Sequence, residues 1–315
     1  MPNKIAGIHH ISAMVNDVQR TIDFYAGVLG LRLVKKTINF DRPEVYHLYF
    51  GNESGEPGTV ITFFPWPKQL KGRIGTGQVG VTGYMIPNGS MSFWKNRLQK
   101  FNIEFISSSR FWETYLQFQD PDDLQIELVE RKGGSQNTWG FGGIGIENAI
   151  KGFSGATLYS AQPNKTAQLL EEVFRLECIG QEDGFLRFQS EAEVGNIIDI
   201  KLTASIRGLM GAGTVHHIAW RAKDEEEHQK WWSILQDKGY YPTEILNRNY
   251  FKALYFHEAG GILFEIATDP PGFAVDESIE NLGERLMLPS WLDQRREELE
   301  ELLPPIEVRV LEGDK

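Results

Sequence analysis

The stretches Ile8-His9-His10-Ile11 and Val215-His216-His217-Ile218 decide the fold of this chain. Each pair of histidines follows a nearby glycine (Gly7 and Gly213), and the two pairs hold four of the chain's seven histidines. Two copies of so rare a pair in matching surroundings predict one structural unit that is used twice. Because neutral imidazole is a common metal ligand, we expect a metal ion between the two copies.

Four segments of the chain share one predicted order of elements, β-α-β-β-β. These modules lie at about 6–65, 78–130, 152–205 and 213–268. Their predicted helices are 18–29, 90–101, 165–174 and 225–238. The strands expected after the helices of the last two modules are 185–189, 197–202, 243–247, 253–257 and 262–267. The mixture of strands and helices in each module predicts a fold of the α+β class.

A glycine-rich segment at 133–150 separates the second module from the third. We therefore expect two domains, 1–150 and 151–315, with two modules in each. After the fourth module, the apolar positions of 290–303 predict an amphipathic helix that ends at a Pro-Pro pair. The side chains expected to dock this helical tail on a sheet are Trp291, Leu292, Leu299 and Leu302.

The composition excludes several classes of partner. The chain is 41% hydrophobic and 24% charged, as an ordinary globular protein is. A net charge of −11 and the lack of a Lys and Arg stripe argue against nucleic acid. We expect no membrane span, since no apolar run is long enough, and no signal peptide at the start. The single cysteine, Cys178, suits a cytoplasmic protein.

Strand geometry limits which histidines can share a metal. Neighbouring side chains of a strand face opposite sides of the sheet, so one histidine of each pair is expected to face the concave side. The ligands are then either the second histidine of both pairs or the first histidine of both pairs. Alternation alone does not choose between these two sets.

A third ligand is expected in the last strand of a module. Alignment of these strands places Glu265 level with Glu127 of the second module and Thr62 of the first. A carboxylate between apolar neighbours is costly to bury without a partner. Histidines that face Glu265 would lower this cost, and Glu265 would lower the cost of burying the histidines. The first strands of modules two and three lack histidine, and we expect Glu127 to be paired or rim-exposed. Two His and one carboxylate with open positions are typical of non-haem Fe(II) oxygenases, whereas structural zinc sites are closed.

Three further stretches accompany the histidine motifs: Tyr46-His47-Leu48-Tyr49-Phe50-Gly51, 57–65 and 260–273. With them, the chain resembles the vicinal oxygen chelate superfamily of glyoxalases, bleomycin-resistance proteins and extradiol dioxygenases. More narrowly, it resembles ring-cleaving dioxygenases that act on hydroquinones. The resemblance implies two cupped mixed sheets, with module 1 paired with module 4 around the metal.

The resemblance also implies which residues form the site. The second histidine of each pair becomes the ligand, so the implied metal set is His10, His217 and Glu265. The implied surrounding residues are His9, Ser12, His216, Arg248 and Tyr255. Among them, Tyr255 is expected to donate a proton or hydrogen bond, and Arg248 to stabilise an anionic substrate oxygen. A base, His216 or His9, is expected to take the phenolic proton.

The function implied by the resemblance is an extradiol-type dioxygenase that inserts O2 into a hydroquinone or catechol-like aromatic. The implied ion is Fe(II), with Mn(II) as the alternative. A glyoxalase-like lyase or isomerase is a second hypothesis, which Thr62 in place of a second Glu disfavours. A binding or resistance protein for small aromatic compounds is a third, which the complete ligand set disfavours. The expected partners are an aromatic diol and O2, and homo-oligomerisation is left open.

Overall fold

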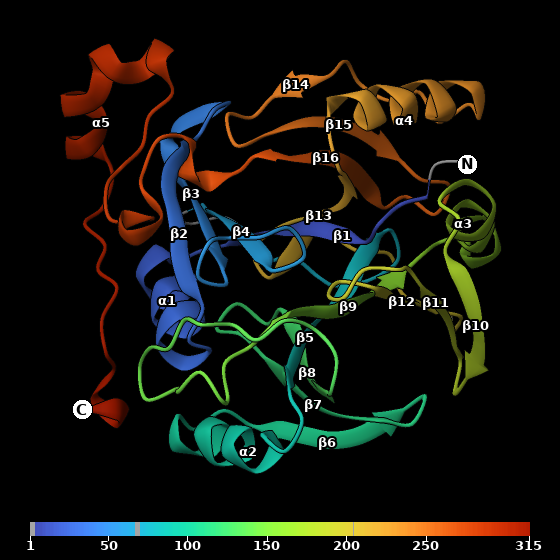
Figure 1. Ribbon diagram of the computed structural model, residues 1–315, viewed down its shortest axis with the longest axis horizontal. Helices are drawn as coiled ribbons and strands as arrows, with labels where there is room; N and C mark the ends of the chain where they lie inside the picture. The colour runs from blue at the N-terminus through green and yellow to red at the C-terminus, as the bar shows by residue number, and fades with distance from the viewer. Residues whose placement is uncertain (1–3, 67–69, 204) are drawn as a thin grey trace.

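Four modules make up most of the computed structural model, which describes residues 4–66, 70–203 and 205–315 (Figure 1). The first contains β1 (Ile8–Val15), α1 (Val18–Ile22), a π-helical turn (Asp23–Val28), β2 (Arg32–Asn39), β3 (Arg42–Gly51) and β4 (Val60–Pro65). The second contains β5 (Gln78–Pro87), α2 (Met91–Lys100), β6 (Phe105–Arg110), β7 (Glu113–Gln119) and β8 (Gln125–Arg131). The third contains β9 (Gly152–Tyr159), α3 (Pro163–Gln168), a π-helical turn (Leu169–Val173), β10 (Glu177–Glu182), β11 (Phe185–Gln189) and β12 (Ile197–Lys201). The fourth contains β13 (Thr214–Ala222), α4 (Glu225–Asp237), β14 (Leu246–Asn247), β15 (Phe251–His257) and β16 (Leu263–Pro271).

The modules pair into two eight-stranded sheets. The first sheet has the order β14-β15-β16-β13-β1-β4-β3-β2, so it joins the first and fourth modules. The second has the order β10-β11-β12-β9-β5-β8-β7-β6, so it joins the second and third. Each sheet contains both parallel and antiparallel neighbours. The expected α+β class is thereby confirmed, and the first and fourth modules do pair.

A pair of β-bulges marks the centre of each sheet. The register of β1 against its antiparallel neighbour β13 shifts at His9 and again at His216, so that each is an extra residue without a counterpart. In the second sheet, Gly80 of β5 and Ser154 of β9 are the corresponding extra residues. Bulges re-aim the side chain that they insert, and they interrupt the simple alternation of a strand.

The predicted helices form, with local differences. Asp17 caps α1 by accepting a hydrogen bond from the backbone N–H of Arg20 at 2.9 Å. In the first and third modules, the second half of the predicted helix is a π-helical turn instead of α-helix. Strand β10 was not expected, and the strand expected at 243–247 is reduced to the two residues of β14. Both are short or exposed edge strands, for which the apolar pattern is weak.

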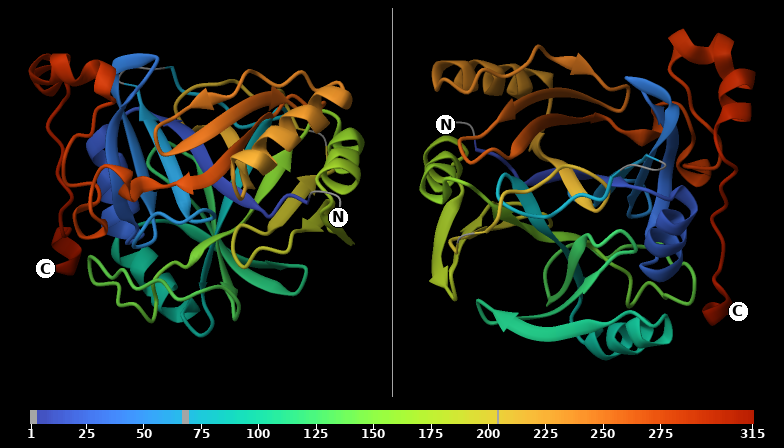
Figure 2. Two further views of the ribbon diagram at one scale, coloured as in Figure 1. Left: turned by 45° about the horizontal axis from the view of Figure 1, so that its top comes forward. Right: turned by 180° about the vertical axis from the view of Figure 1, so that it is seen from behind.

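The C-terminal segment begins with a 3-10 helix (Ser290–Arg295) and continues as α5 (Arg296–Leu302). Leu292 and Leu299 are buried, as expected for docking, whereas Trp291 and Leu302 are 60% and 56% exposed. Trp291 still packs edge-to-face on Phe40, with 5.7 Å between the ring centres. The docking prediction was wrong for Leu302, the last residue of α5. From α5 the chain runs down one side of the molecule towards α2 (Figures 1 and 2).

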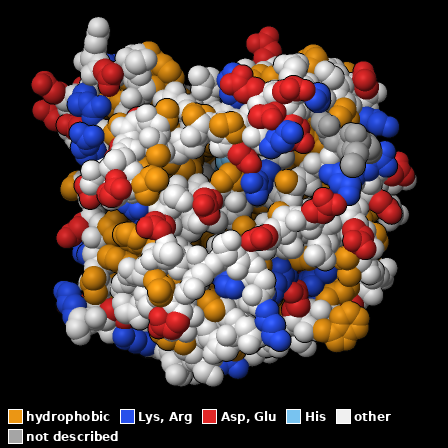
Figure 3. Space-filling model, in the orientation of Figure 1, with side chains coloured by type: hydrophobic (Ala, Val, Ile, Leu, Met, Phe, Trp, Pro, Cys, Tyr) orange, Lys and Arg blue, Asp and Glu red, His pale blue; other side chains and the backbone are white. Residues whose placement is uncertain are grey.

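The expected lack of a membrane span and of a nucleic-acid partner can be compared with the structure. Within the described ranges, no helix is long and apolar enough to cross a membrane. We expect no signal peptide at the start of the chain, and residues 1–3 of that stretch lie outside the described ranges. On the face drawn in Figure 3, acidic and basic side chains are interspersed, and no continuous basic stripe is seen.

Candidate metal centre

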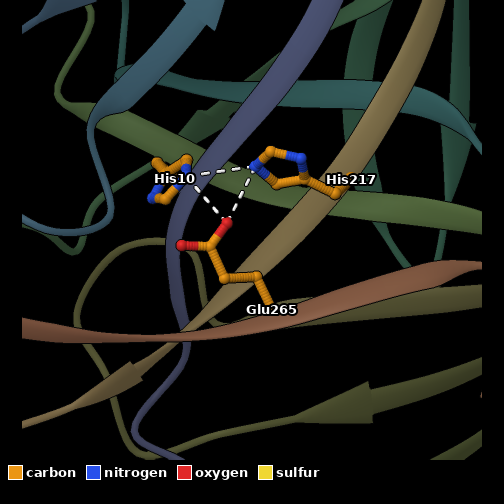
Figure 4. Close-up of side chains that lie close together, drawn as sticks. All are labelled: His10, His217 and Glu265. Carbon is orange, nitrogen blue, oxygen red and sulfur yellow. Dashed lines mark hydrogen bonds and ion pairs between the residues drawn. The ribbon is translucent and has the colours of Figure 1, made fainter. Parts of the chain in front are cut away.

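His10 of β1, His217 of β13 and Glu265 of β16 converge at the middle of the first sheet (Figure 4). The Nε2 atoms of the two histidines lie 3.3 Å apart. Oε2 of Glu265 is 3.4 Å from Nε2 of His10 and 2.9 Å from Nε2 of His217. All three side chains are buried. The structure therefore brings together the three residues that the resemblance implies as a metal set.

The surroundings of Glu265 fit a bound cation. Both carboxylate oxygens are buried, and among the described residues neither makes a hydrogen bond of good geometry, although Oε2 lies close to Nε2 of His10 and of His217. Burial acts to raise the pKa of Glu265, but the neighbouring His10 and His217 outweigh it and hold that pKa well below its usual range. Ligand atoms about 2.1 Å from one ion, at angles of about 90 to 110°, lie roughly 3.0 to 3.4 Å apart. The observed triangle is close to these spacings, so the three residues fit a divalent metal ion.

The bulges turn the first histidine of each pair back towards the second. Nδ1 of His9 lies 2.9 Å from Nδ1 of His10, and Nδ1 of His216 lies 2.8 Å from Nδ1 of His217. The expectation that His9 and His216 face away along the strand is therefore wrong. It assumed regular alternation, which a bulge breaks.

The electrostatics of the two bulge histidines suit hydrogen-bond acceptors. Burial, followed by the adjacent His10, lowers the pKa of His9 well below its ordinary value. Burial, followed by the adjacent His217, lowers the pKa of His216 to about 3. Both imidazoles therefore stay neutral near pH 7. A neutral Nδ1 can accept a hydrogen bond from the Nδ1–H of a histidine whose Nε2 faces the metal position.

A cavity of about 440 Å³ is lined by His10 and His217, two of the three candidate ligands. Its aromatic lining consists of Phe40, Tyr49, Phe64, Trp66, Phe251 and Tyr255. Among its polar lining residues are Ser12, His47, His216 and Arg248. Larger hollows of about 790 and 700 Å³ lie elsewhere, but none of the three ligands lines them. The size and aromatic walls of the ligand-side cavity suit a small aromatic molecule.

Arg248 and Tyr255, two of the implied site residues, both line this cavity. Tyr255 pairs with Glu265 across β15 and β16, and its ring centre is 5.6 Å from that of His217. Burial, followed by the charge of Glu265, raises the pKa of Tyr255 well above its usual value, so the phenol stays protonated. The Arg248 guanidinium lies 5.5 Å from the centre of the Tyr255 ring and 3.8 Å from a carboxylate oxygen of Asp41.

Sequence reasoning missed His47 as a cavity residue. Its Nε2 lies 2.9 Å from Oγ1 of Thr62, and its Nδ1 lies 2.9 Å from the hydroxyl of Tyr49. Thr62 Oγ1 lies in turn 2.8 Å from Oγ of Ser12. Alternation along β3 places His47 and Tyr49 on one face, which was the available signal. Their connection to Thr62 depends on the pairing of β3 with β4, which local sequence does not specify.

The second sheet holds an ion-pair network at the corresponding place. Glu127 of β8 is buried and lies 2.9 Å from Arg110. Asp199 of β12 is held at 2.9 Å by Arg110 and at 2.8 Å by Arg187. Glu127 is therefore paired, which was one of its two expected states. Here guanidinium groups compensate two buried carboxylates, whereas histidines lie beside Glu265 in the first sheet.

Comparison with known proteins agrees with this geometry. The family model described as "Glyoxalase/Bleomycin resistance protein/Dioxygenase superfamily" matches residues 7–128 and 152–276. The chain is 56% identical over 312 residues to the Bacillus subtilis protein named "Putative ring-cleaving dioxygenase MhqO", covering 99% of this chain and 100% of that protein. It is 31% identical over 310 residues to the "Chlorohydroquinone/hydroquinone 1,2-dioxygenase" of Sphingobium indicum, covering 95% and 96%. A crystal structure described as a "putative dioxygenase from Bacillus subtilis" superposes with a TM-score of 0.97 at 57% identity, covering 98% of this chain and all of the other.

Proposed function

Because this chain belongs to the glyoxalase/bleomycin resistance protein/dioxygenase superfamily, we propose that it is a ring-cleaving dioxygenase of the extradiol type. The proposed substrates are a hydroquinone or catechol-like aromatic and O2, given the hydroquinone dioxygenase among its relatives. The observation that carries the proposal is the convergence of His10, His217 and Glu265 beside an aromatic-lined cavity. Two imidazoles and one carboxylate are the ligand set of non-haem Fe(II) oxygenases. Fe(II) is the proposed ion, with Mn(II) as the alternative.

Fe(II), when bound, would bring the aromatic diol and O2 together and carry electron density from the ring to oxygen. The chain's own residues bind and orient the diol. Phe64, Trp66 and Phe251 supply ring surfaces against which an aromatic ring packs and from which water is displaced. Arg248 carries a permanent positive charge into the cavity and would stabilise an anionic substrate oxygen.

Tyr255 and His216 both offer hydrogen-bond donors to the substrate. Tyr255 keeps its phenolic hydrogen and would donate it in a hydrogen bond to a substrate oxygen. When Nδ1 of His216 accepts from His217, its Nε2 carries the remaining hydrogen, so His216 offers the cavity a donor. We propose this donor role for His216 in place of the proton-accepting role that the resemblance implies for His216 or His9. His9 does not line the cavity, and we propose that it supports His10 only.

Oxygen uptake tests the proposed function. Protein loaded anaerobically with Fe(II) is mixed with air-saturated hydroquinone, catechol and their substituted forms, and O2 consumption and ring-opened products are followed. We expect uptake that depends on both the diol and the metal, and its loss in His217→Ala and Glu265→Ala. The control is His257→Ala, which changes an exposed histidine outside the cavity. Absence of uptake with every para- and ortho-diol would contradict the proposal.

The environment of Thr62 disfavours a four-ligand glyoxalase-like site. Thr62 stands level with Glu265 in the aligned strands, but its hydroxyl is engaged by Ser12 and His47. A lyase or isomerase would turn over its substrate without O2, so repeating the experiment with deoxygenated substrate solutions separates the two functions.

A further inference from the structure

Four side chains form a continuous hydrogen-bonded series at one wall of the cavity. It runs from the Tyr49 hydroxyl to Nδ1 of His47 (2.9 Å), and from Nε2 of His47 to Oγ1 of Thr62 (2.9 Å). It then passes from Oγ1 of Thr62 to Oγ of Ser12 (2.8 Å). Tyr49, His47 and Ser12 line the cavity, and Ser12 lies directly opposite His217 on the neighbouring strand. The series therefore ends beside the candidate metal centre.

The imidazole of His47 is held firmly in this series. Its ring lies between those of Tyr49 and Phe64, with centre-to-centre distances of 4.1 and 4.3 Å and interplanar angles of 33° and 37°. Both ring nitrogens have hydroxyl partners. Packing on two rings and two hydrogen bonds restrict rotation, so the ring can transmit a fixed donor and acceptor pattern.

Both ionisable members of the series are neutral near pH 7. Burial, followed by His10 and His217, lowers the pKa of His47 well below its ordinary value. Burial, followed by Tyr255 and Glu265, raises the pKa of Tyr49 well above its ordinary value. A neutral imidazole has one N–H donor and one acceptor nitrogen, and a neutral phenol has one hydrogen to donate. The series can therefore point in only two directions.

The hydrogen-bond acceptor available to the Tyr49 hydroxyl determines which of the two directions is favoured. Tyr49 is 1% exposed, and Nδ1 of His47 is the acceptor that its hydroxyl finds among the described residues. If Nδ1 carried the hydrogen, the buried phenol O–H would lose that acceptor, which is costly. Tyr49 therefore donates to Nδ1, which leaves the hydrogen of His47 on Nε2. Nε2–H then donates to Thr62.

The consequence emerges at Ser12. Since Thr62 accepts from His47, its own hydrogen points to Oγ of Ser12. Ser12 accepts that bond and keeps its hydrogen for the cavity that it lines. We propose that Tyr49 and His47 are positioning residues that orient the hydroxyls of Thr62 and Ser12, so that Ser12 donates a hydrogen bond to an ionised phenolic oxygen. The inference rests on the proposed function only in taking the ligand to be a phenol.

The tautomer of His47 gives a direct test that does not depend on turnover. Zn(II) is redox-inert, so the Zn(II)-loaded full-length protein is suited to ¹⁵N-imidazole NMR, with the His47 signal assigned by its loss in His47→Gln. We expect hydrogen on Nε2 and an unprotonated Nδ1 in the wild type, and a changed tautomer population in Tyr49→Phe. Hydrogen on Nδ1 in the wild type would overturn the inference.

Binding of two matched probes tests the consequence. 4-Nitrophenol, whose phenolate is seen by its visible absorbance, is titrated into the Zn(II)-loaded protein beside 4-nitroanisole, which cannot ionise. We expect His47→Leu and Thr62→Val to weaken phenolate binding about three- to tenfold, and Ser12→Ala by about tenfold or more. His47→Gln and Thr62→Ser keep a suitable donor or hydroxyl and should retain most of the affinity.

Selectivity distinguishes positioning from packing. The inference requires the losses to fall on the phenolate, with the anisole changed by less than about twofold. An equal loss for both probes, or no loss for either, would overturn it. If no diol supports O2 uptake while the tautomer and the selectivity are as expected, the proposed dioxygenase function fails and the positioning role stands.

Discussion

His9 and His216 occupy equivalent bulges on neighbouring antiparallel strands, and each lies with its Nδ1 within 2.9 Å of Nδ1 of the histidine that follows it. The central pair of strands therefore carries two copies of one arrangement, a histidine facing Glu265 with a second histidine behind it. Metal-binding histidines commonly donate their other N–H to a carboxylate or carbonyl. In the proposed metal centre, a second, neutral histidine would be that acceptor.

The arrangement predicts that the bulge histidines support metal affinity. We expect His9→Ala and His216→Ala each to weaken metal binding about 10- to 100-fold, because the ligand behind each loses its acceptor. His9→Asn and His216→Asn keep an oxygen acceptor near the Nδ1 position and should lose less. Competition with a chelator measures the affinities. Equal affinities for the wild type and both alanine variants would show that these contacts do not orient the ligands.

Metal binding should stabilise the fold. A ligand that binds only the folded state adds about 2.7 kcal/mol when its concentration is 100 times Kd. We expect Fe(II) under anaerobic conditions, or Zn(II), to raise the thermal midpoint of the wild type. Glu265→Ala should show no such rise, since it lacks the carboxylate between His10 and His217. The same rise in Glu265→Ala would place the ion elsewhere.

The pH dependence of stability should include His228 of α4. Its Nε2 lies 2.8 Å from the carbonyl oxygen of Ile266, and burial lowers its pKa below the ordinary 6.5 although that hydrogen bond opposes the shift. The pKa of His228 is lower in the folded state than in the unfolded state. The contribution of neutral His228 to the unfolding free energy is therefore complete above pH 6.5 and is lost as the pH falls. Below pH 6.5, His228→Gln should reduce the slope of the unfolding free energy by up to about 1.4 kcal/mol per pH unit.

Denaturant unfolding of the metal-free protein at several pH values measures this slope. The matched control is His257→Gln, which changes an exposed histidine on β15. If both variants follow the wild-type curve, proton uptake by His228 does not contribute to acid unfolding.

Periodicity predicted most of the strands and all four module helices, because buried faces repeat at fixed spacings. Alignment of the modules also placed Glu265 level with Glu127 and Thr62 in their last strands. Periodicity could not predict the bulges at His9 and His216, since a bulge depends on pairing with a partner strand. The cavity role of His47 was missed for a similar reason, because its partner Thr62 lies on a different strand.

The ion-pair network of the second sheet gives the last prediction. Arg110 is buried between Glu127 and Asp199, each at 2.9 Å. Arg110→Ala leaves two buried carboxylates with one guanidinium fewer, and removing one partner of such a group costs about 3–5 kcal/mol.

We therefore expect a large fall in unfolding free energy for Arg110→Ala, measured in denaturant. Lys4→Ala breaks an exposed pair with Glu191 and should change little. Replacing Arg110 and Glu127 together by apolar residues should recover part of the loss, because fewer unpaired charges remain buried. Metal affinity at the first sheet should stay unchanged in the folded variants, since the network shares no residue with the ligand set. A loss of metal affinity in the double variant would mean that the two sheets are coupled.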